Sequence, residues 1–179
     1  MKNLFLTLFV SASILFTACS DDSTNPIDNG DNIQDVVEFN LENIQWELDN
    51  ADMPNPSQRD KYERMSFFVD EDLNYTWTWK GKLGSETLIF EGLLSYNESQ
   101  FNHDNGQPIS YITITVYTIN GRDLPGAFVG IFTADDEGNL ILNVEPEVMN
   151  WGTYPEPQNG LGSGSSGDES VYRFHQKAA

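Results

Sequence analysis

Hydrophobic and polar residues alternate along short stretches of the chain, which is the pattern of β-strands that bury one face. Tyr75, Trp77 and Trp79 are separated by threonines, so they would share one face of a strand. Comparable runs occur at residues 44–48, 65–69, 88–96, 109–119, 128–133, 140–144 and 171–176. Short polar or Gly-containing stretches between the runs indicate turns. The pattern therefore predicts an all-β domain of about eight antiparallel strands, with no long helix.

Two architectures suit about eight short strands in one domain, because both protect the edges of a sheet. The first is a single small antiparallel β-barrel, and the second is a β-sandwich. The assignment of 44–48 is open, since Leu41, Ile44 and Leu48 would also suit a short helix. The segment 146–169 is rich in Pro, Gly and Ser, and we expect it to be mostly irregular.

The first residues differ from the rest of the chain. Lys2 precedes an almost wholly apolar stretch, 4–16, which matches the charged and apolar regions of a secretory signal peptide. This stretch is shorter than the roughly 20 apolar residues of a permanent transmembrane helix. We therefore expect 1–18 to be a signal peptide. Residues 19–35 should form a flexible acidic tether, which leaves 36–179 as one folded domain.

Residues 16–19, Phe-Thr-Ala-Cys, resemble a lipobox, the recognition pattern of lipoprotein signal peptidase. The resemblance implies that Cys19 receives a diacylglyceryl group and becomes the acylated amino terminus after cleavage. Phe16 departs from the leucine that the family favours at this position. Residues 20–23, Ser-Asp-Asp-Ser, resemble the acidic export signal of lipoproteins in Bacteroidota-type bacteria, although a solvated tether would have the same composition. We expect a lipid anchor in the outer membrane, with the domain on the cell surface or otherwise on the periplasmic face.

The chain is strongly acidic, with a formal net charge of −19 at pH 7. A polyanion of this size repels nucleic acid and anionic lipid headgroups, so we expect no nucleic-acid partner, and we expect the membrane to be reached through the lipid on Cys19. The single cysteine allows no intramolecular disulfide. The charge favours solubility and does not by itself indicate a function.

Five short motifs follow one another through the folded part of the chain. They are Trp46-x-Leu48, Tyr75-x-Trp77-x-Trp79, Glu91-Gly92-Leu93-Leu94-Ser95-Tyr96, Gly138-Asn139-Leu140-x-Leu142 and Tyr172-x-Phe174. Together they resemble the small lipocalin-like domains of bacterial lipoproteins, although residues 43–45 lack the glycine with which that family opens its barrel. The resemblance implies a β-barrel whose interior could carry a small apolar ligand, with Trp77 and Trp79 among the wall residues.

The sequence contains no arrangement typical of a catalytic site. His103 and His175 are the only histidines, and neither accompanies a Gly-x-Ser-x-Gly elbow or a second histidine at ligand spacing. Residues 70–74, Asp-Glu-Asp-Leu-Asn, resemble the start of a calcium loop but lack its glycine and distal glutamate, so a hairpin turn is the simpler interpretation. Glu91 is expected to face outward from a strand. We expect a non-enzymatic protein without cofactor or metal, with an uncharacterised hydrolase as the alternative.

Two non-enzymatic functions fit these features. In the first, the barrel binds a small apolar ligand through Tyr75, Trp77 and Trp79, which would otherwise be ordinary core residues. In the second, the domain is a glycan- or protein-binding module that uses Trp151 and Tyr154, two aromatic residues in the irregular segment. A cavity of roughly 300–1,000 Å³ inside the barrel would favour the first function, and a filled interior would favour the second.

Overall fold

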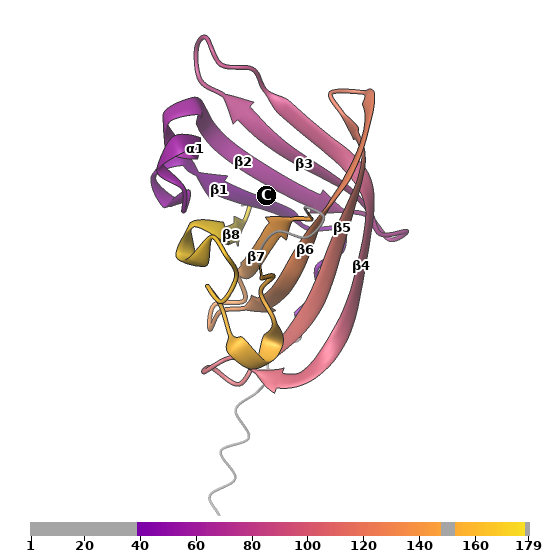
Figure 1. Cartoon of the computed structure of the whole chain (residues 1–179), viewed down its shortest axis with the longest axis vertical. Helices are drawn as coiled ribbons and strands as arrows, with labels where there is room; N and C mark the ends of the chain where they lie inside the picture. The colour runs from indigo at the N-terminus through magenta and orange to yellow at the C-terminus, as the bar shows by residue number, and fades with distance from the viewer. Residues whose placement is uncertain (1–38, 148–152, 178–179) are drawn as a thin grey trace, which may run out of the picture. The chain divides into compact units, whose positions relative to one another are not determined.

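The computed structural model describes residues 39–147 and 153–177, which form a closed barrel of eight antiparallel strands (Figure 1). The strands are β1 (Gln45–Asp49), β2 (Tyr62–Val69), β3 (Asn74–Gly81), β4 (Leu88–Asn102), β5 (Pro108–Ile119), β6 (Arg122–Ala134), β7 (Leu140–Pro146) and β8 (Val171–Gln176). Each strand pairs with the next along the chain, and β1 pairs with β8 to close the sheet. The predicted barrel is confirmed and the β-sandwich is wrong, because one sheet curves round to meet itself. The short-helix alternative for 44–48 is also wrong.

The signal peptide, Cys19, the tether and Trp151 lie outside the described residues. The predictions that concern them are neither supported nor contradicted by the structure. No helix within 39–147 or 153–177 is long and apolar enough to cross a membrane.

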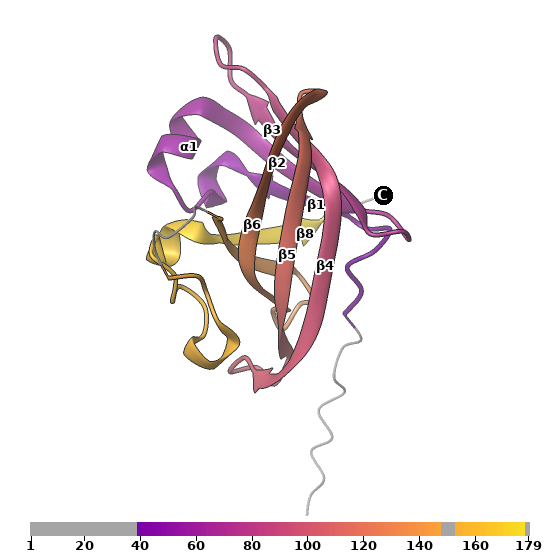
Figure 2. The ribbon, with the colours of Figure 1, turned by 45° about the vertical axis from the view of Figure 1, so that its right-hand side comes forward.

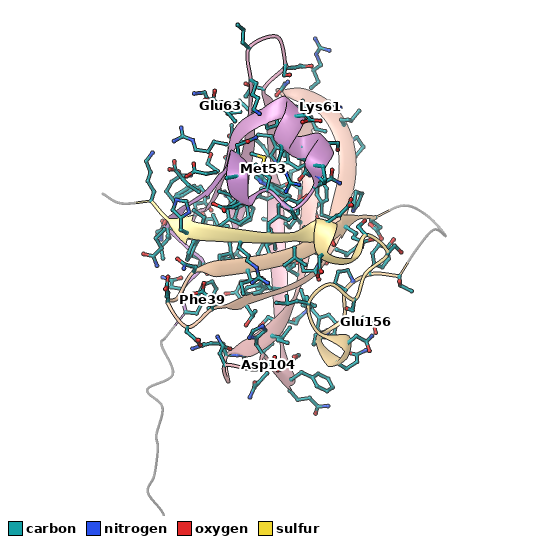
Figure 3. All side chains as sticks on the ribbon, turned by 90° about the vertical axis from the view of Figure 1, so that its left-hand side faces the viewer. Phe39, Met53, Lys61, Glu63, Asp104 and Glu156 are labelled. Carbon is teal, nitrogen blue, oxygen red and sulfur yellow. The ribbon has the colours of Figure 1, made fainter. Side chains whose placement is uncertain are left out.

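Short helices accompany the strands. They are η1 (Asn50–Asp52), α1 (Pro56–Lys61), η2 (Pro157–Asn159) and η3 (Gly167–Ser170). α1 begins after Asn55, whose side chain accepts a hydrogen bond from the backbone N of Ser57 at 2.8 Å, and Pro56 suits the first helical turn. η1 and α1 connect β1 to β2, and Met53 between them is fully buried beside α1 (Figure 3). The sequence pattern did not predict α1, because six residues are too few to show a helical period.

Two hairpin turns share one local structure built on aspartate. In the β2–β3 turn, Asp70 Oδ1 accepts hydrogen bonds from the backbone N of Asp72 at 3.0 Å and of Asn74 at 2.8 Å. The β6–β7 turn repeats this arrangement, with Asp135 Oδ1 accepting from the residues two and four positions later, both at 2.9 Å. The side-chain amide of Asn74 also donates to Asp70 Oδ2 at 3.0 Å, and this hydrogen bond, with the two from the backbone, lowers the pKa of the Asp70 carboxyl. The hairpin interpretation of 70–74 is therefore confirmed.

β4 and β6 extend further than the alternation of hydrophobic residues indicated. β4 continues through 97–102, where mostly exposed polar residues occupy both faces. β6 begins at Arg122, directly after a two-residue turn in which Asn120 and Gly121 have positive φ angles of 53° and 70°. Both extensions pair with β5. Alternation fails at these positions because neither face of the strand is buried.

The barrel interior is filled with aromatic side chains. Trp46, Phe67, Trp77 and Phe174 are fully buried. The ring centroid of Trp77 lies 5.9 Å from that of Phe67 and 6.4 Å from that of Phe174. A barrel of eight strands is just wide enough for its own side chains, and ring pairs of this kind contribute about 0.5–1.5 kcal/mol each beyond the area that they bury. The interior is therefore a packed core.

Two inward-facing positions carry glycine because a neighbouring strand approaches closely. A Cβ at Gly92 would overlap the carbonyl oxygen of Thr115, and a Cβ at Gly130 would overlap that of Asn143. The β4–β5 register also shifts between Glu91 and Gly92. The strand is therefore irregular at Gly92, and this lets β4 curve with the barrel wall.

The segment 153–170 forms a second layer outside the barrel wall (Figure 2). Ile131 on β6 and Ile141 on β7 alternate with the interior residues and so point outward, yet both are buried. Ile109 at the start of β5 is buried on the same outer face. These three side chains give the segment an apolar surface on which to pack.

Buried polar side chains of β7 fix this layer in place. Asn143 is fully buried; its Oδ1 accepts the backbone N–H of Gly162 at 2.8 Å, and its Nδ2 donates to Ser170 Oγ at 2.8 Å. Glu145 Oε1 accepts the backbone N–H of Ser166 at 2.6 Å. The segment is irregular, as expected, but its Gly/Ser tract is held by specific hydrogen bonds.

Candidate functional site

The three aromatic residues expected to line a ligand cavity lie in the packed core. Trp77 is fully buried and Tyr75 is 2% exposed, while Trp79 is partly buried. Trp77 packs edge-on against Tyr172 at 5.4 Å and against Trp79 at 5.4 Å. The rings of Tyr172 and Trp79 occupy the space around Trp77, so a ligand enclosed there would have to displace core side chains.

The polar atoms of the same three residues have no hydrogen-bond partner among the described residues. They are Tyr75 Oη, Trp77 Nε1 and Trp79 Nε1. Burial raises the pKa of the Tyr75 hydroxyl far above its ordinary value, because no neighbouring group compensates the loss of water. These atoms make the core less stable than rings without polar groups would.

An apolar pocket lies at the end of the barrel that carries the β5–β6 turn; we call it the mouth pocket. It has a volume of about 190 Å³. It is lined by Phe90, Val116, Ile119, Leu124, Pro125, Gly126, Ala127, Phe128, Pro146 and Glu147. Phe90 and Phe128 lie 6.0 Å apart and pack on Trp79 at 5.2 Å and Trp77 at 5.4 Å, respectively. The predicted tryptophans therefore support the mouth pocket from below and do not line it.

A shallow hollow of about 300 Å³ adjoins the mouth pocket. The two share Ile119 and Leu124, and Leu124 is 56% exposed. Asn120 fixes this rim, since its Oδ1 accepts the backbone N–H of Ile89 at 2.7 Å and its Nδ2 donates to Glu86 Oε1 at 2.8 Å. The mouth thus has an exposed apolar rim, and the hydrogen bonds of Asn120 hold the β5–β6 turn against residues 86–89.

A larger and more polar hollow lies on the outside of the barrel; we call it the outer groove. It has a volume of about 550 Å³. One wall is the β4–β5 turn and the other is the stretch around η2, and Figure 3 labels Asp104 and Glu156 in these two parts. It is lined by Phe101, Asn102, His103, Asp104, Ile109, Pro157, Gln158, Asn159, Gly160, Leu161, Asp168 and Arg173. Its volume falls within the usual range of ligand sites.

The remaining candidate residues do not form a catalytic arrangement with one another. Glu91 faces outward from β4 as expected, and its Oε2 accepts a hydrogen bond from Thr118 Oγ1 at 3.0 Å. His103 Nδ1 lies 3.2 Å from Asn105 Oδ1, and His175 is exposed on β8. Among the described residues, no three His, Cys, Asp or Glu side chains are grouped so that they could hold a metal ion. Tyr154 is half-buried in the outer layer.

The comparisons with protein-family models, with curated protein sequences and with solved structures return no match to this chain. The site must therefore be interpreted from its own geometry. Sequence patterns identified Phe90 and Phe128 as strand residues, but nothing in the sequence indicated that they form the floor of a pocket. No local sequence pattern predicted the outer groove, because its two walls come from segments about 50 residues apart along the chain.

Proposed function

We propose that this protein is a lipid-anchored, non-enzymatic binding protein whose barrel holds the apolar end of a small ligand at its mouth. The mouth pocket carries the proposal, since nearly all its lining is apolar and its floor is a pair of phenylalanine rings. Exposed Leu124 gives an approaching ligand an apolar surface outside the pocket. The anchor rests on Cys19 and on the signal-like residues before it.

The size of the mouth pocket limits the ligand. Its volume of about 190 Å³ is below the range of roughly 300–1,000 Å³ that encloses most small molecules. It suits one aromatic ring or the end of an acyl chain. The rest of such a ligand would lie in the adjoining hollow beside Leu88 and Leu124. The interior below Phe90 and Phe128 stays packed in this arrangement.

Filling the mouth pocket tests the proposal. Gly126 faces inward, lines the pocket, and has open space where a Cβ would stand. Gly126→Leu should therefore occupy the pocket without disturbing the fold. Val129→Leu, an enlargement on the outer face of the same strand, is the matched control. Binding of the neutral fluorophore N-phenyl-1-naphthylamine to residues 20–179 would be measured by titration.

We expect the parent chain and Val129→Leu to bind the fluorophore equally, and Gly126→Leu to bind about tenfold more weakly or not at all. Native mass spectrometry of the parent chain purified from a bacterial host would then identify the class of any retained ligand. Equal binding by all three proteins, or binding by none of them, would contradict the proposal.

A glycan- or protein-binding module is the second candidate function. The outer groove favours it, because it is larger than the mouth pocket and its rim is polar. Display of the domain on the cell surface, which residues 20–23 suggest, would suit either function. The two sites lie on different parts of the barrel, so their ligands can be tested separately.

A further inference from the structure

The outer groove continues beyond β8. A second hollow of about 420 Å³ lies between β8 and the η1–α1 connection, and its lining includes Met53, Pro54 and Arg59. The two hollows share Asp168 and Arg173 and so adjoin at this pair; we call the two together the extended groove. An elongated shape of this kind suits a chain-like ligand better than a compact one.

The lining of the extended groove combines side chains that donate and accept hydrogen bonds with a few apolar surfaces. Asn102, Gln158 and Asn159 bring side-chain amides, which do both. Phe101 is partly exposed and brings an aromatic ring to the lining, while Ile109 and Leu161 provide apolar contacts. A ligand with many hydroxyl groups and flat apolar ring faces would match this mixture.

The charges of the groove argue against strongly charged ligands. The groove is lined by two arginines and three aspartates, so its positive and negative charges nearly balance. These residues are Arg59, Arg173, Asp52, Asp104 and Asp168. The chain as a whole carries −19, which repels polyanions. A polycation gains little from a groove whose own charges nearly balance. A neutral ligand is the class that remains.

Arg173 is the most distinctive polar group of the groove. It is exposed on the outer face of β8, and it forms no ion pair with any residue in the described part of the chain. Arg59, by contrast, donates from its guanidinium to the carbonyl oxygen of Met53 at 2.6 Å. The planar guanidinium of Arg173 can bind two neighbouring hydroxyl groups, and the Asp168 carboxylate in the same lining can accept hydrogen bonds from others.

The walls of the groove are held in place before any ligand arrives. Asn105, in the β4–β5 turn, donates from Nδ2 to the carbonyl oxygen of Ala134 at 3.0 Å. On the opposite wall, the side-chain amides of Gln158 and Asn159 both donate to Glu156 Oε2. Rigid walls lower the entropy that binding must overcome.

We propose that the extended groove binds a neutral oligosaccharide, with Phe101 stacking on a sugar ring and Arg173 and Asp168 binding its hydroxyl groups. This inference does not depend on the mouth pocket, which lies elsewhere on the barrel. It gives the domain a second ligand of different chemistry.

The test uses the full chain extracted in a detergent without sugar headgroups. A panel of neutral oligosaccharides, namely β-glucan, xylan and mannan fragments, would be screened for binding, and the strongest ligand would be titrated by calorimetry. Phe101→Ala and Arg173→Gln remove two of the three proposed contacts. Tyr117→Ala and Arg64→Gln are matched controls, since Tyr117 is an exposed aromatic residue outside the groove and Arg64 lies on β2.

We expect at least one neutral oligosaccharide to bind, each groove variant to weaken binding about tenfold, and both controls to bind like the parent chain. Absence of binding across the panel would overturn the proposal, as would equal binding by the groove variants and the controls. Binding of acidic polysaccharides or extended peptides in place of neutral sugars would overturn it too. Gly126→Leu should bind the oligosaccharide normally, which separates this result from the test of the mouth pocket.

Discussion

At the scale of single residues, two buried tyrosines differ in whether their hydroxyl groups have a partner. The Tyr172 hydroxyl accepts a hydrogen bond from Gln58 Nε2 at 2.8 Å, which joins β8 to α1. The Tyr75 hydroxyl has no partner among the described residues. A buried polar group without a partner destabilises the folded state, whereas a hydrogen-bonded one stabilises it modestly. Removing the two hydroxyl groups should therefore have opposite effects.

Tyr75→Phe should leave the free energy of unfolding unchanged or raise it by up to about 1 kcal/mol, since it deletes an unpartnered hydroxyl. Tyr172→Phe should lower it by about 1 kcal/mol, because Gln58 Nε2 loses its acceptor. Urea unfolding at pH 7 measures both. A larger loss of stability for Tyr75→Phe than for Tyr172→Phe would contradict this reading of the core.

Tyr75 and Tyr172 also lead to a prediction of how the free energy of unfolding changes with pH in the alkaline range. Burial raises the pKa of both tyrosines above the ordinary value of 10.0, and the hydrogen bond from Gln58 partly offsets this for Tyr172. Both hydroxyl groups are protonated in the folded and the unfolded chain below about pH 10, so their titration does not change stability there; stability falls as the pH rises toward the higher folded-state pKa values. Tyr75→Phe should therefore lose less stability between pH 9 and about pH 11 than the parent chain does.

At the scale of elements, β7 is buried on both faces, which is unusual for a strand in a small antiparallel barrel. Its inner face joins the aromatic core, and its outer face binds the segment 153–170. Asn143 and Glu145 would look like solvent-facing residues in the sequence, yet they hold the outer layer through hydrogen bonds. This layer forms one wall of the outer groove, so its order matters for any ligand there.

Asn143→Ala should release the outer layer while leaving the barrel closed. The change removes the acceptor for Gly162 N–H and the donor to Ser170 Oγ, and we expect a loss of about 2–3 kcal/mol. Hydrogen exchange should speed up at Gly162 more than at the β3 amides. Asn97→Ala, an exposed asparagine on β4, is the control and should change neither quantity. Uniform loss of protection throughout the barrel would show that Asn143 supports the whole fold.

At the scale of the whole molecule, a strongly acidic domain would be kept at a membrane by its lipid alone. A net charge of −19 repels anionic headgroups. Each buried methylene of an acyl chain contributes about 0.8 kcal/mol, so two or three chains suffice for stable anchoring. Cys19 has the only thiol to which such chains could be attached.

Cys19→Ala should abolish incorporation of an alkyne-labelled palmitate into the chain during growth, because the variant has no thiol for the first acylation step. Ser20→Ala is the matched control and should be labelled like the parent chain. Labelling would be read by in-gel fluorescence after click chemistry. Undiminished label in Cys19→Ala would show that the resemblance to a lipobox is misleading.

The sequence by itself determined the strand pattern and the class of fold. Runs such as Tyr75, Trp77 and Trp79 predicted strands because one buried face imposes a period of two residues on the chain. The turn at 70–74 was also predicted, since an aspartate that binds the backbone two and four residues later acts locally. These features depend on interactions between residues near one another in the sequence.

Only the tertiary structure decided between barrel and sandwich, since the pairing of β1 with β8 joins the two ends of the sheet. It also placed Trp77 in the core and Phe90 and Phe128 at the mouth, although all three occur in similar alternating strands. The outer groove depends on a Gly/Ser tract binding to Asn143 on a distant strand. The physical reason is the same in each case: strand periodicity tells which residues share a face, and long-range packing decides what that face contacts.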